Sequence, residues 1–443
     1  MDTPICDFVR GYADRDILRL HMPGHKGMPL LGMEVLDITE VSGADSLYEA
    51  DGIIARSEAN TGRLFGCRTF YSAEGSSQCI RAMLYLVMLR AKRMGRPPLI
   101  AAGRNAHKTF LTAAALLDMD VWWLYPREGG SYHSCDLTPE DLDACLSRER
   151  PAAVYLTTPD YLGHITDISA MAEVCHKHDV LLAVDDAHGA YLRFLPEDRH
   201  PISLGADICC DSAHKTLPAL TGAAYLHLSA EMDREVGDWA KEALALFGST
   251  SPSYLILQSL DAVALYLEDY PRKLEAFLPK VRELKAALRG HGYVLYGEEP
   301  LKVTLDAKKY GYSGTRIAAH LRENGMEPEF ADEDYLVLML TPELPVGSLL
   351  RLEKVLRDLP RKEAIRAAAP RFLPGEQVLS IRTAMLSDHE TLPADQCLGR
   401  ILAVPTVGCP PAVPVLVCGE KITEHAIDCL TYYGIETCCV VKE

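Results

Sequence analysis

Two residues with chemical potential stand at the ends of apolar segments of this sequence. Asp185 lies near the end of VLLAVDD, and Lys215 follows ADICC, within DSAHKT. In open parallel sheets, ligands bind outside the carboxyl ends of the strands. If both segments are strands of one such sheet, both side chains point toward the same edge. Ser212, His214 and Lys215 would then line a ligand site instead of a solvated surface.

One cofactor chemistry needs this pair of side chains. Pyridoxal phosphate attaches to a lysine amine and requires an acid that keeps its pyridine nitrogen protonated. The negative charge of a carboxylate favours the protonated ring, which then serves as an electron sink. A desolvated lysine near cations forms and exchanges Schiff bases readily. We therefore predict pyridoxal phosphate, with Lys215 as the Schiff-base lysine and Asp185 beside the ring nitrogen.

The phosphate of this cofactor needs an anion site, and Gly75, Ser76 and Ser77 offer one. These residues stand where a loop enters the helical pattern CIRAMLYLVMLRAKRMG. Backbone N–H groups at a helix start, a glycine that allows close approach and two hydroxyls together bind anions. A Gly-Ser-Ser sequence by itself is usually an ordinary helix cap. Combined with the aspartate and the lysine, in this chain order, it strengthens the prediction of pyridoxal phosphate.

The elements that must position these residues follow from the apolar pattern between about residues 64 and 230. Short apolar segments alternate with helical patterns there. One helix is expected to start at Thr138, because this capping residue precedes a proline and two acids. Apolar strands that alternate with helices predict an α/β fold with a mostly parallel sheet covered on both faces. The expected strands fall at 99–102, 121–125, 152–158, 180–186, 206–210 and 222–228.

The pattern changes along the rest of the chain. Residues 253–290 predict one long helix, or two helices with a break at Pro271. A strand, helix, strand, helix pattern follows, which indicates a smaller α+β domain. We expect four parts, namely an N-terminal arm at 1–36, a cofactor-binding large domain at 37–270, the small α+β domain at 271–365 and a C-terminal domain at 366–443.

Composition argues against several classes of protein. The 443 residues carry a net charge of −17, which does not suit a binder of nucleic acid or of anionic membranes, because both need a basic face. No apolar stretch is long enough to span a membrane, and no signal-peptide pattern opens the chain, so we expect a cytoplasmic protein. The 14 cysteines include no Cys-x-x-Cys pair, which predicts reduced thiols and no metal site.

In its longer motifs the sequence resembles the Orn/Lys/Arg decarboxylase family, in its shorter form. That family belongs to the fold-type I enzymes, which use pyridoxal phosphate. Its pairing of an early Pro-Gly-His-Lys with a later Ser-x-His-Lys-Thr is specific among such enzymes. The matching motifs are HMPGHKG (21–27), DITEVSGADSLYEADGII (37–54), GSS (75–77), RNAHKT (104–109), VDDAHGA (184–190), SAHKT (212–216), STSPSY (249–254) and CGEKI (418–422).

The resemblance implies roles for residues of the site. His107 would stack on the cofactor ring, His188 would lie near the ring and His214 near the phosphate. Thr250 and Ser251 resemble the segment that reaches the phosphate of a neighbouring subunit, which implies a homodimer with shared active sites. The expected catalytic residues are Lys215, Asp185, His107 and His214, and the expected cofactor contacts also include Gly75, Ser76, Ser77, His188, Ser212, Thr250 and Ser251.

The resemblance also implies an activity, the decarboxylation of arginine, lysine or ornithine to a polyamine-type amine and CO2. Glu329, in ENGMEPE, resembles a family residue that contacts the distal cation of the substrate, and Asp45 and Glu49 are further candidates. Two positions depart from the family pattern. Residues 409–412 read Cys-Pro-Pro-Ala in place of Tyr-Pro-Pro-Gly, and Asp160 stands where a hydroxyl residue is usual.

Other functions stay open at this point. Fold and cofactor alone do not distinguish decarboxylation from transamination, racemisation or lyase chemistry such as β-elimination. An aminotransferase would normally bind the α-carboxylate through an arginine of the smaller domain. Arg316 and Arg322 are available there, but both lie in a helical pattern without special context. A non-catalytic regulatory protein on the same scaffold is the remaining alternative.

Overall fold

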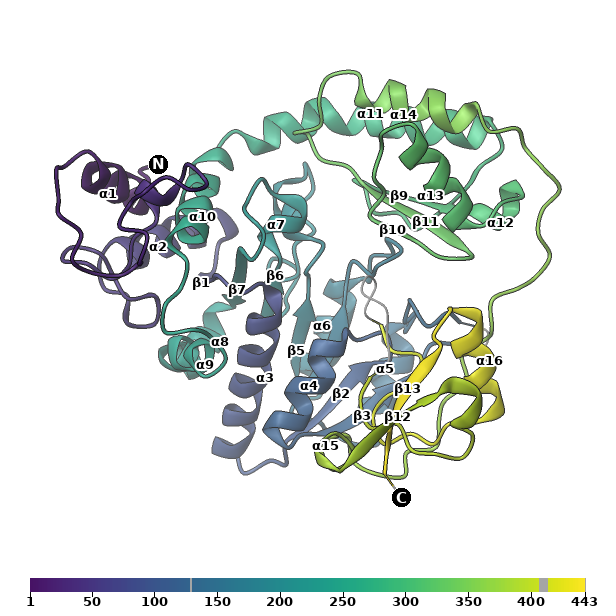
Figure 1. The fold of residues 1–443 in the computed structure, drawn as a ribbon. Helices are drawn as coiled ribbons and strands as arrows, with labels where there is room; N and C mark the ends of the chain where they lie inside the picture. The colour runs from purple at the N-terminus through teal and green to yellow at the C-terminus, as the bar shows by residue number, and fades with distance from the viewer. Residues whose placement is uncertain (128–129, 406–412, 443) are drawn as a thin grey trace. The chain divides into compact units, whose positions relative to one another are not determined.

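The computed structural model describes residues 1–127, 130–405 and 413–442 (Figure 1). The chain forms two compact units, and each unit combines two separate segments of the chain. The first unit comprises Met1–Pro97 and Ile168–Leu274, and the second comprises Pro98–Asp167 and Glu275–Glu443. The boundaries of these units do not coincide with those of the four parts expected from the sequence. The division into four parts therefore stays a prediction.

The strands of the first unit bring the predicted lysine and aspartate segments together. Their order is β1-β7-β6-β5. β5 and β6 are parallel, and the register pairs Asp185 with Cys210. The expectation that both segments are strands of a mostly parallel sheet is therefore confirmed, and the structure adds that they are direct neighbours. The strands are β1 (Arg68–Ser72), β5 (Leu181–Asp185), β6 (Ile208–Asp211) and β7 (Ala224–Leu228).

The first unit is α/β, as the alternating pattern predicts. All residues of β5, β6 and β7 are buried, which is the expected burial of strands covered on both faces. The one departure from parallel order is β7, which pairs antiparallel with both β6 and β1. Helix α3 packs on β6 and β7. The longer helices are α1 (Pro4–Ala13), α2 (Ile53–Phe65), α3 (Ser76–Arg93), α6 (Ile168–Lys177) and α10 (Tyr254–Tyr266).

The N-terminal arm contains a helix that the sequence pattern did not indicate. In α1, Ile5, Val9 and Tyr12 follow the helical period and are buried. The carboxylate of Asp261 accepts hydrogen bonds from the backbone N–H groups of Ile5 (3.0 Å) and Cys6 (2.9 Å), so it binds the first turn of this helix. The arm is thus anchored at its start by a buried acid from α10.

The second unit contains three further parallel strands and two antiparallel sheets. β4 (Ala153–Thr157), β2 (Leu99–Gly103) and β3 (Asp120–Leu124) are parallel in that order. The antiparallel order β10-β11-β9-β8 belongs to the smaller α+β pattern expected from the sequence, and β12 pairs with β13 near the C-terminus. These strands are β8 (Val294–Tyr296), β9 (Lys302–Asp306), β10 (Phe330–Ala331), β11 (Tyr335–Met339), β12 (His389–Pro393) and β13 (Thr437–Val441).

Local signals in the sequence set the helix boundaries. Thr138 and Asp141 form a reciprocal capping box at the start of α5 (Pro139–Leu146), as the capping pattern predicts. The segment 253–290 forms two helices, because α10 ends at Tyr266 and α11 (Tyr270–Gly290) begins before Pro271, where proline is tolerated. The other longer helices of this unit are α4 (Lys108–Leu117), α13 (Gly314–Glu323), α14 (Ser348–Arg357) and α16 (Glu424–Tyr432).

Two further expectations concern membranes and thiols. Among the described residues, no helix combines the length and the apolar character needed to cross a membrane. The described cysteines are free thiols, and most of them are buried. The expectation of reduced thiols stays a prediction.

Candidate active site

Lys215 lies on a short helical turn directly after β6. This turn, α7 (Ala213–Thr216), begins after Ser212, whose carbonyl oxygen accepts a hydrogen bond from the Lys215 backbone N–H (3.0 Å). The Lys215 Nζ atom lies 3.1 Å from Nε2 of His188, which follows β5. The parallel pairing of β5 and β6 therefore brings a lysine amine and an imidazole from separate segments to the same edge of the sheet.

Asp185 is the last residue of β5 and is only 2% exposed. Its Oδ1 atom accepts a hydrogen bond from the backbone N–H of Ala187 (3.2 Å) and lies 3.9 Å from Sγ of Cys210. A carboxylate in such a buried setting interacts strongly with a cationic partner, because little water screens the charge. This geometry suits a residue that stabilises a protonated pyridine nitrogen.

The structure provides space and donors for a phosphate group beside Gly75. Gly75 has a positive φ of 73°, and α3 starts at the next residue without a side-chain cap. A Cβ atom at Gly75 would meet no atom within 4 Å, so the approach to the helix start is open. Ser212 donates a hydrogen bond to Ser76 (Oγ to Oγ, 2.8 Å), and Oγ1 of Thr216 is buried without a hydrogen-bond partner among the described residues. These groups fit a bound anion.

His214 is held in a defined orientation next to this region. Its Nδ1–H donates to the carbonyl oxygen of Ala223 (2.8 Å). Burial lowers the pKa of His214, and the positive charge of Lys215 adds to this effect, although the hydrogen bond to Ala223 opposes it. The ring is therefore neutral at physiological pH, with Nε2 carrying the lone pair.

His107 belongs to the second unit, where it caps a helix. Its Nδ1 atom accepts a hydrogen bond from the backbone N–H of Thr109 (3.1 Å) at the start of α4 and lies 2.9 Å from Oγ1 of the same residue. This contact explains the local sequence RNAHKT, because a histidine before the helix satisfies a first-turn N–H group. The predicted stacking of His107 on the cofactor ring stays a prediction.

The loop with Thr250 and Ser251 is exposed and lies beside the start of the phosphate site. The backbone N–H of Ser249 donates to the side chain of Glu74, which directly precedes Gly75. The backbone N–H of Ser251 donates to Oγ of Ser249 (3.1 Å), which stabilises the turn. The predicted contact of this loop with a neighbouring subunit stays a prediction.

The three substrate candidates have different environments. Glu329 is exposed, and the Tyr161 hydroxyl donates to its Oε1 atom (2.8 Å) at the rim of a largely apolar cavity of about 460 Å³. Asp45 is buried, and its Oδ2 atom accepts hydrogen bonds from the backbone N–H groups of Gly52 (2.9 Å) and Ile54 (2.7 Å), so it caps α2. Glu49 is exposed. Asp45 thus already has a structural role, which leaves Glu329 as the stronger candidate.

The departure at position 160 also has a structural explanation. The Oδ1 atom of Asp160 accepts hydrogen bonds from the backbone N–H groups of Leu162 and His164 (both 2.9 Å) and so stabilises the turn after β4. The carbonyl oxygen of Asp160 accepts a hydrogen bond from Lys302 (3.0 Å). The second departure, Cys409–Ala412, lies outside the described residues.

The sequence patterns did not indicate a buried polar cluster of the first unit. His200, Asp211 and His227 are each 0% exposed, and both histidines lie within 3.2 Å of the Asp211 carboxylate. The available signal was an acid and a histidine inside otherwise apolar strands, ICCD and AYLHL. Charged groups are rarely fully buried without partners. An acid and a histidine in neighbouring apolar strands could therefore have been predicted to pair with each other.

Known proteins with a similar fold or sequence include amino-acid decarboxylases. The fold is shared with the lysine decarboxylase LdcF of Francisella novicida, with a TM-score of 0.79, 18% identity, and coverage of 99% of this chain and 81% of that one. Among curated sequences, the chain is 28% identical to the uncharacterized protein YaaO of Bacillus subtilis, over 97% of this chain and 94% of the relative. It is also 28% identical to the arginine decarboxylase of Bacillus subtilis, over 96% of this chain and 92% of the relative.

A family model that matches the sequence of this chain identifies its family. Residues 3–291 match the family described as Orn/Lys/Arg decarboxylase, major domain. Because this match covers more than half of the chain, the chain belongs to the Orn/Lys/Arg decarboxylase family. The resemblance read from the motifs is confirmed.

Proposed function

We propose that the protein decarboxylates a basic amino acid, namely arginine, lysine or ornithine, with pyridoxal phosphate as cofactor. The products are CO2 and the corresponding polyamine-type amine. The observation that carries this proposal is the pairing of Lys215, 3.1 Å from His188, with the buried Asp185 at the edge formed by two parallel strands. The similarity to an arginine decarboxylase over nearly the whole chain supports it.

Different residues of the chain have different roles in the proposed reaction. When bound, pyridoxal phosphate accepts the electron pair that the breaking Cα–carboxylate bond releases. Asp185 stabilises the proton on the pyridine nitrogen, because its buried carboxylate is the negative partner of that proton. Lys215 holds the cofactor and returns a proton to the substrate Cα, while His188 orients the lysine amine.

The phosphate end is held by the start of α3 and the turn after β6. Ser76 and Ser212 already contact each other, and the unpartnered hydroxyl of Thr216 is available as a further donor. The neutral His214 adds no positive charge, and its Nε2 atom, which carries the lone pair, can accept a proton. This anchoring fixes the ring relative to Asp185, and such orientation contributes a large part of the rate enhancement of an enzyme.

The two arginines considered for transamination give that alternative no support. Arg316 lies on the exposed side of α13, and Arg322 is paired with Glu327 (2.7 Å) at the surface. Neither guanidinium is arranged as a buried receptor for an α-carboxylate. A regulatory protein without activity would have no need for the Lys215, His188 and Asp185 arrangement.

The direct test uses the purified full-length chain with added pyridoxal phosphate. Arginine, lysine and ornithine are supplied separately, and CO2 and the amine are measured. We expect one of the three to be converted at least about tenfold more efficiently than the others, because a pocket matched to one side-chain length separates homologues by that order. Formation of a keto acid without CO2 would identify an aminotransferase, and no reaction with any amino acid would refute catalysis.

Glu329 is expected to tune substrate choice. A carboxylate that contacts a substrate ammonium or guanidinium contributes roughly 1.5–3 kcal/mol. Since Glu329 is exposed in the described chain, we expect the lower end of this range, so Glu329→Gln should reduce kcat/KM for the basic substrate by about tenfold. The matched control is Glu323→Gln, which removes an exposed acid at the end of α13 that does not line this cavity. An equal effect of both substitutions would show that Glu329 is only a surface acid.

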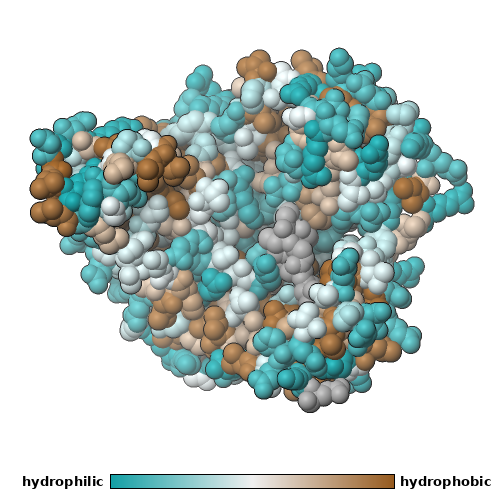
Figure 2. Space-filling model, viewed as in Figure 1, coloured by the Kyte–Doolittle hydropathy of each residue, from teal (hydrophilic) through white to brown (hydrophobic). Residues whose placement is uncertain are grey.

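We also propose a homodimer that buries the N-terminal arm. After α1 the arm exposes large apolar side chains, and Figure 2 shows apolar surface over this region at the left of the view. Exposed apolar patches of this kind mark interaction surfaces. A second copy of the chain is the proposed partner, because a loop resembling the family's intersubunit phosphate contact, Thr250 and Ser251, is exposed as well. The most exposed residues are Leu18 (80%), Leu20 (85%), Leu30 (76%) and Leu31 (85%).

The dimer proposal predicts a change of mass in solution. Leu20→Asp combined with Leu31→Asp should convert the dimer to a monomer at micromolar concentration, because two charges cannot be buried without partners. Sedimentation equilibrium measures the mass directly. Leu350→Asp, at a leucine of α14 that is 73% exposed, is the matched control and should leave the dimer intact. A monomeric wild-type protein would refute the proposal.

We further propose a cytoplasmic location. The described cysteines form no disulfide, and most are buried thiols, which is typical of proteins in a reducing compartment. Fractionation of cells that produce the protein tests this expectation, and recovery in a secreted fraction would contradict it.

A further inference from the structure

A thiol, an imidazole and a carboxylate form a chain of contacts across three strands of the first unit. Sγ of Cys67, directly before β1, lies 3.4 Å from Nδ1 of His227 on β7. Nε2 of the same ring lies 3.1 Å from Oδ2 of Asp211 on β6. None of these residues takes part in the proposed reaction. A nucleophile within reach of a base, which a third group orients in turn, is typical of activated cysteines.

The pairing of the strands explains why these side chains meet. β1 and β7 are antiparallel, and the register pairs Thr69 with His227. Cys67 precedes Thr69 by two residues, so both side chains lie on the same face of the chain. On the other side of β7, His227 is the register partner of Cys209, and Asp211 follows Cys209 by two residues. The thiol, the imidazole and the carboxylate therefore share one face of the sheet.

The chain of contacts leads from the interior to a partly exposed cysteine. His227 and Asp211 are both 0% exposed. Cys67 is only partly buried, and it is followed by the exposed Arg68. The ring of Phe65 packs on His227, with the two ring centroids 4.5 Å apart. The base and its carboxylate are thus shielded from water, while a small reagent can approach the cysteine.

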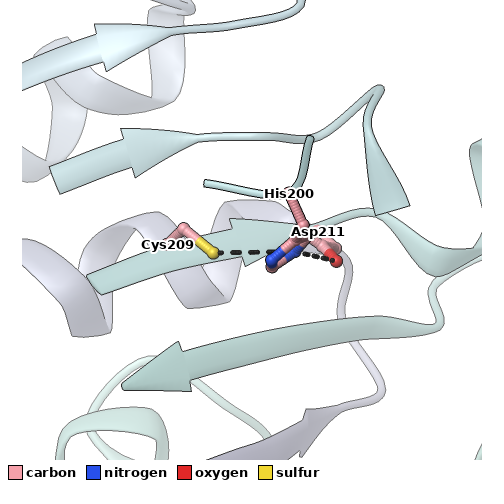
Figure 3. A group of neighbouring side chains, drawn as sticks. All are labelled: His200, Cys209 and Asp211. Carbon is pink, nitrogen blue, oxygen red and sulfur yellow. Dashed lines mark hydrogen bonds and ion pairs between the residues drawn. The ribbon is translucent and has the colours of Figure 1, made fainter. Parts of the chain in front are cut away.

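The charges of the buried groups make His227 a strong base. Burial opposes a positive charge on His227, but Cys67 and Asp211 raise the pKa of this imidazole to about 10. Burial also opposes ionisation of Asp211, but His200 and His227 lower the pKa of its carboxyl group. His200 lies 3.2 Å from the same carboxylate oxygen, and Figure 3 shows this contact. Because burial lowers the pKa of His200, that ring is neutral, and His227 is the ring that holds a proton next to the sulfur.

Two further groups next to this pair support the same arrangement. Oγ1 of Thr69 lies 2.9 Å from Nδ1 of His227, so the N–H group is shared between a hydroxyl oxygen and the sulfur. Arg193 adds a positive charge, since its Nη2 atom lies 3.1 Å from the position that a Cβ atom on Gly66 would take. The thiolate is the reactive form of cysteine, and neighbouring positive groups stabilise it.

We propose that Cys67 is a reactive thiol, activated by His227 and Asp211, which exchanges with small disulfides such as oxidised low-molecular-weight thiols. The proton of the thiol passes to Nδ1 of His227, and the sulfur forms a bond to one sulfur of the disulfide. The S–S bond of the small molecule breaks, and its other half leaves as a thiolate that takes up this proton. The products are a mixed disulfide on Cys67 and one released thiol.

The experiment measures the reactivity of each cysteine in the full chain saturated with pyridoxal phosphate. Iodoacetamide, a small neutral probe, is added in limiting amount at neutral pH, and peptide mass spectrometry gives the rate at each position. We expect Cys67 to react about tenfold faster than Cys145, which is also partly exposed but lies in the last turn of α5. In denaturant the two rates should become similar, because unfolding separates Cys67 from His227.

Oxidised glutathione serves as the disulfide probe, and variants identify the groups involved. We expect a mixed disulfide on Cys67 that dithiothreitol removes, and it should be absent from Cys67→Ser but present in Cys145→Ser. His227→Gln should slow the alkylation of Cys67 by about tenfold, because the thiol then lacks its base. Thr69→Val keeps the imidazole and should retain the fast reaction.

The proposal is wrong if Cys67 and Cys145 react equally fast in the folded chain, if His227→Gln leaves the rate at Cys67 unchanged, or if glutathione attaches only elsewhere. If His227→Gln does not fold, the comparison of the two cysteines in the wild-type protein decides. All of these readouts are independent of decarboxylase activity, so their failure would leave the proposed function unaffected.

Discussion

Replacing Lys215 with alanine is expected to abolish both turnover and the visible absorbance of the bound cofactor. The lysine amine is the proposed covalent attachment, and His188, 3.1 Å away, has no primary amine that could replace it. Loss of attachment and of proton return to the substrate should lower kcat by roughly a thousandfold or more. Absorbance titration with pyridoxal phosphate and a CO2 assay measure the two effects separately.

The controls for this prediction distinguish chemistry from charge. Lys215→Arg keeps a positive charge at the site but cannot form a Schiff base, so it should fail in the same way. Lys92→Ala removes an exposed lysine from the last turn of α3 and should behave as wild type. If Lys215→Ala retains the cofactor absorbance, another residue holds the cofactor and the assignment is wrong.

Asp185→Asn is the second substitution with a large expected effect. The neutral amide has almost the same shape, so the cofactor should still bind, but it cannot stabilise the proton on the pyridine nitrogen. An opposite charge shifts the pKa of such a partner by about one to three units, which corresponds to roughly 1.4–4 kcal/mol. We expect kcat to fall by roughly 10- to 1,000-fold at saturating cofactor.

The measurement for Asp185 combines kinetics with cofactor binding. Asp185→Glu retains the charge and should recover part of the activity, although the buried position at the end of β5 tolerates the longer side chain poorly. The Asp185→Asn variant and the wild-type protein should bind similar amounts of pyridoxal phosphate in an absorbance titration. Turnover of Asp185→Asn close to that of wild type would exclude the proposed role.

Much of the local structure could be predicted because it depends on neighbours in the sequence. The reciprocal cap at Thr138 involves residues three positions apart, and the break before α11 follows from a proline. The apolar segments around Asp185 and Lys215 become strands because continuous apolar sequence must be buried on both faces. Their common edge follows from the general rule for parallel sheets, and the register confirms it.

Other features depend on contacts between distant residues and could not be read from motifs. Asp45 was a further candidate for substrate contact, yet it caps α2, because the chain returns to it at Gly52 and Ile54. Glu329 was expected to contact the distal cation of the substrate, and the structure shows it exposed and hydrogen-bonded to Tyr161, which is far away in the sequence. A motif shows which side chain could bind a substrate. Tertiary packing decides whether that side chain already makes hydrogen bonds within the protein.

By itself, the sequence determined the strands that lead to Asp185 and Lys215, the family and the residue types that pyridoxal chemistry needs. Only the tertiary structure decided the partners, such as His188 beside Lys215 and the buried group around Asp211. The physical reason is the range of the interactions. Helix caps and strand periodicity act over a few residues, whereas a buried charge must find compensation anywhere in the folded chain, and that choice depends on which strands become neighbours.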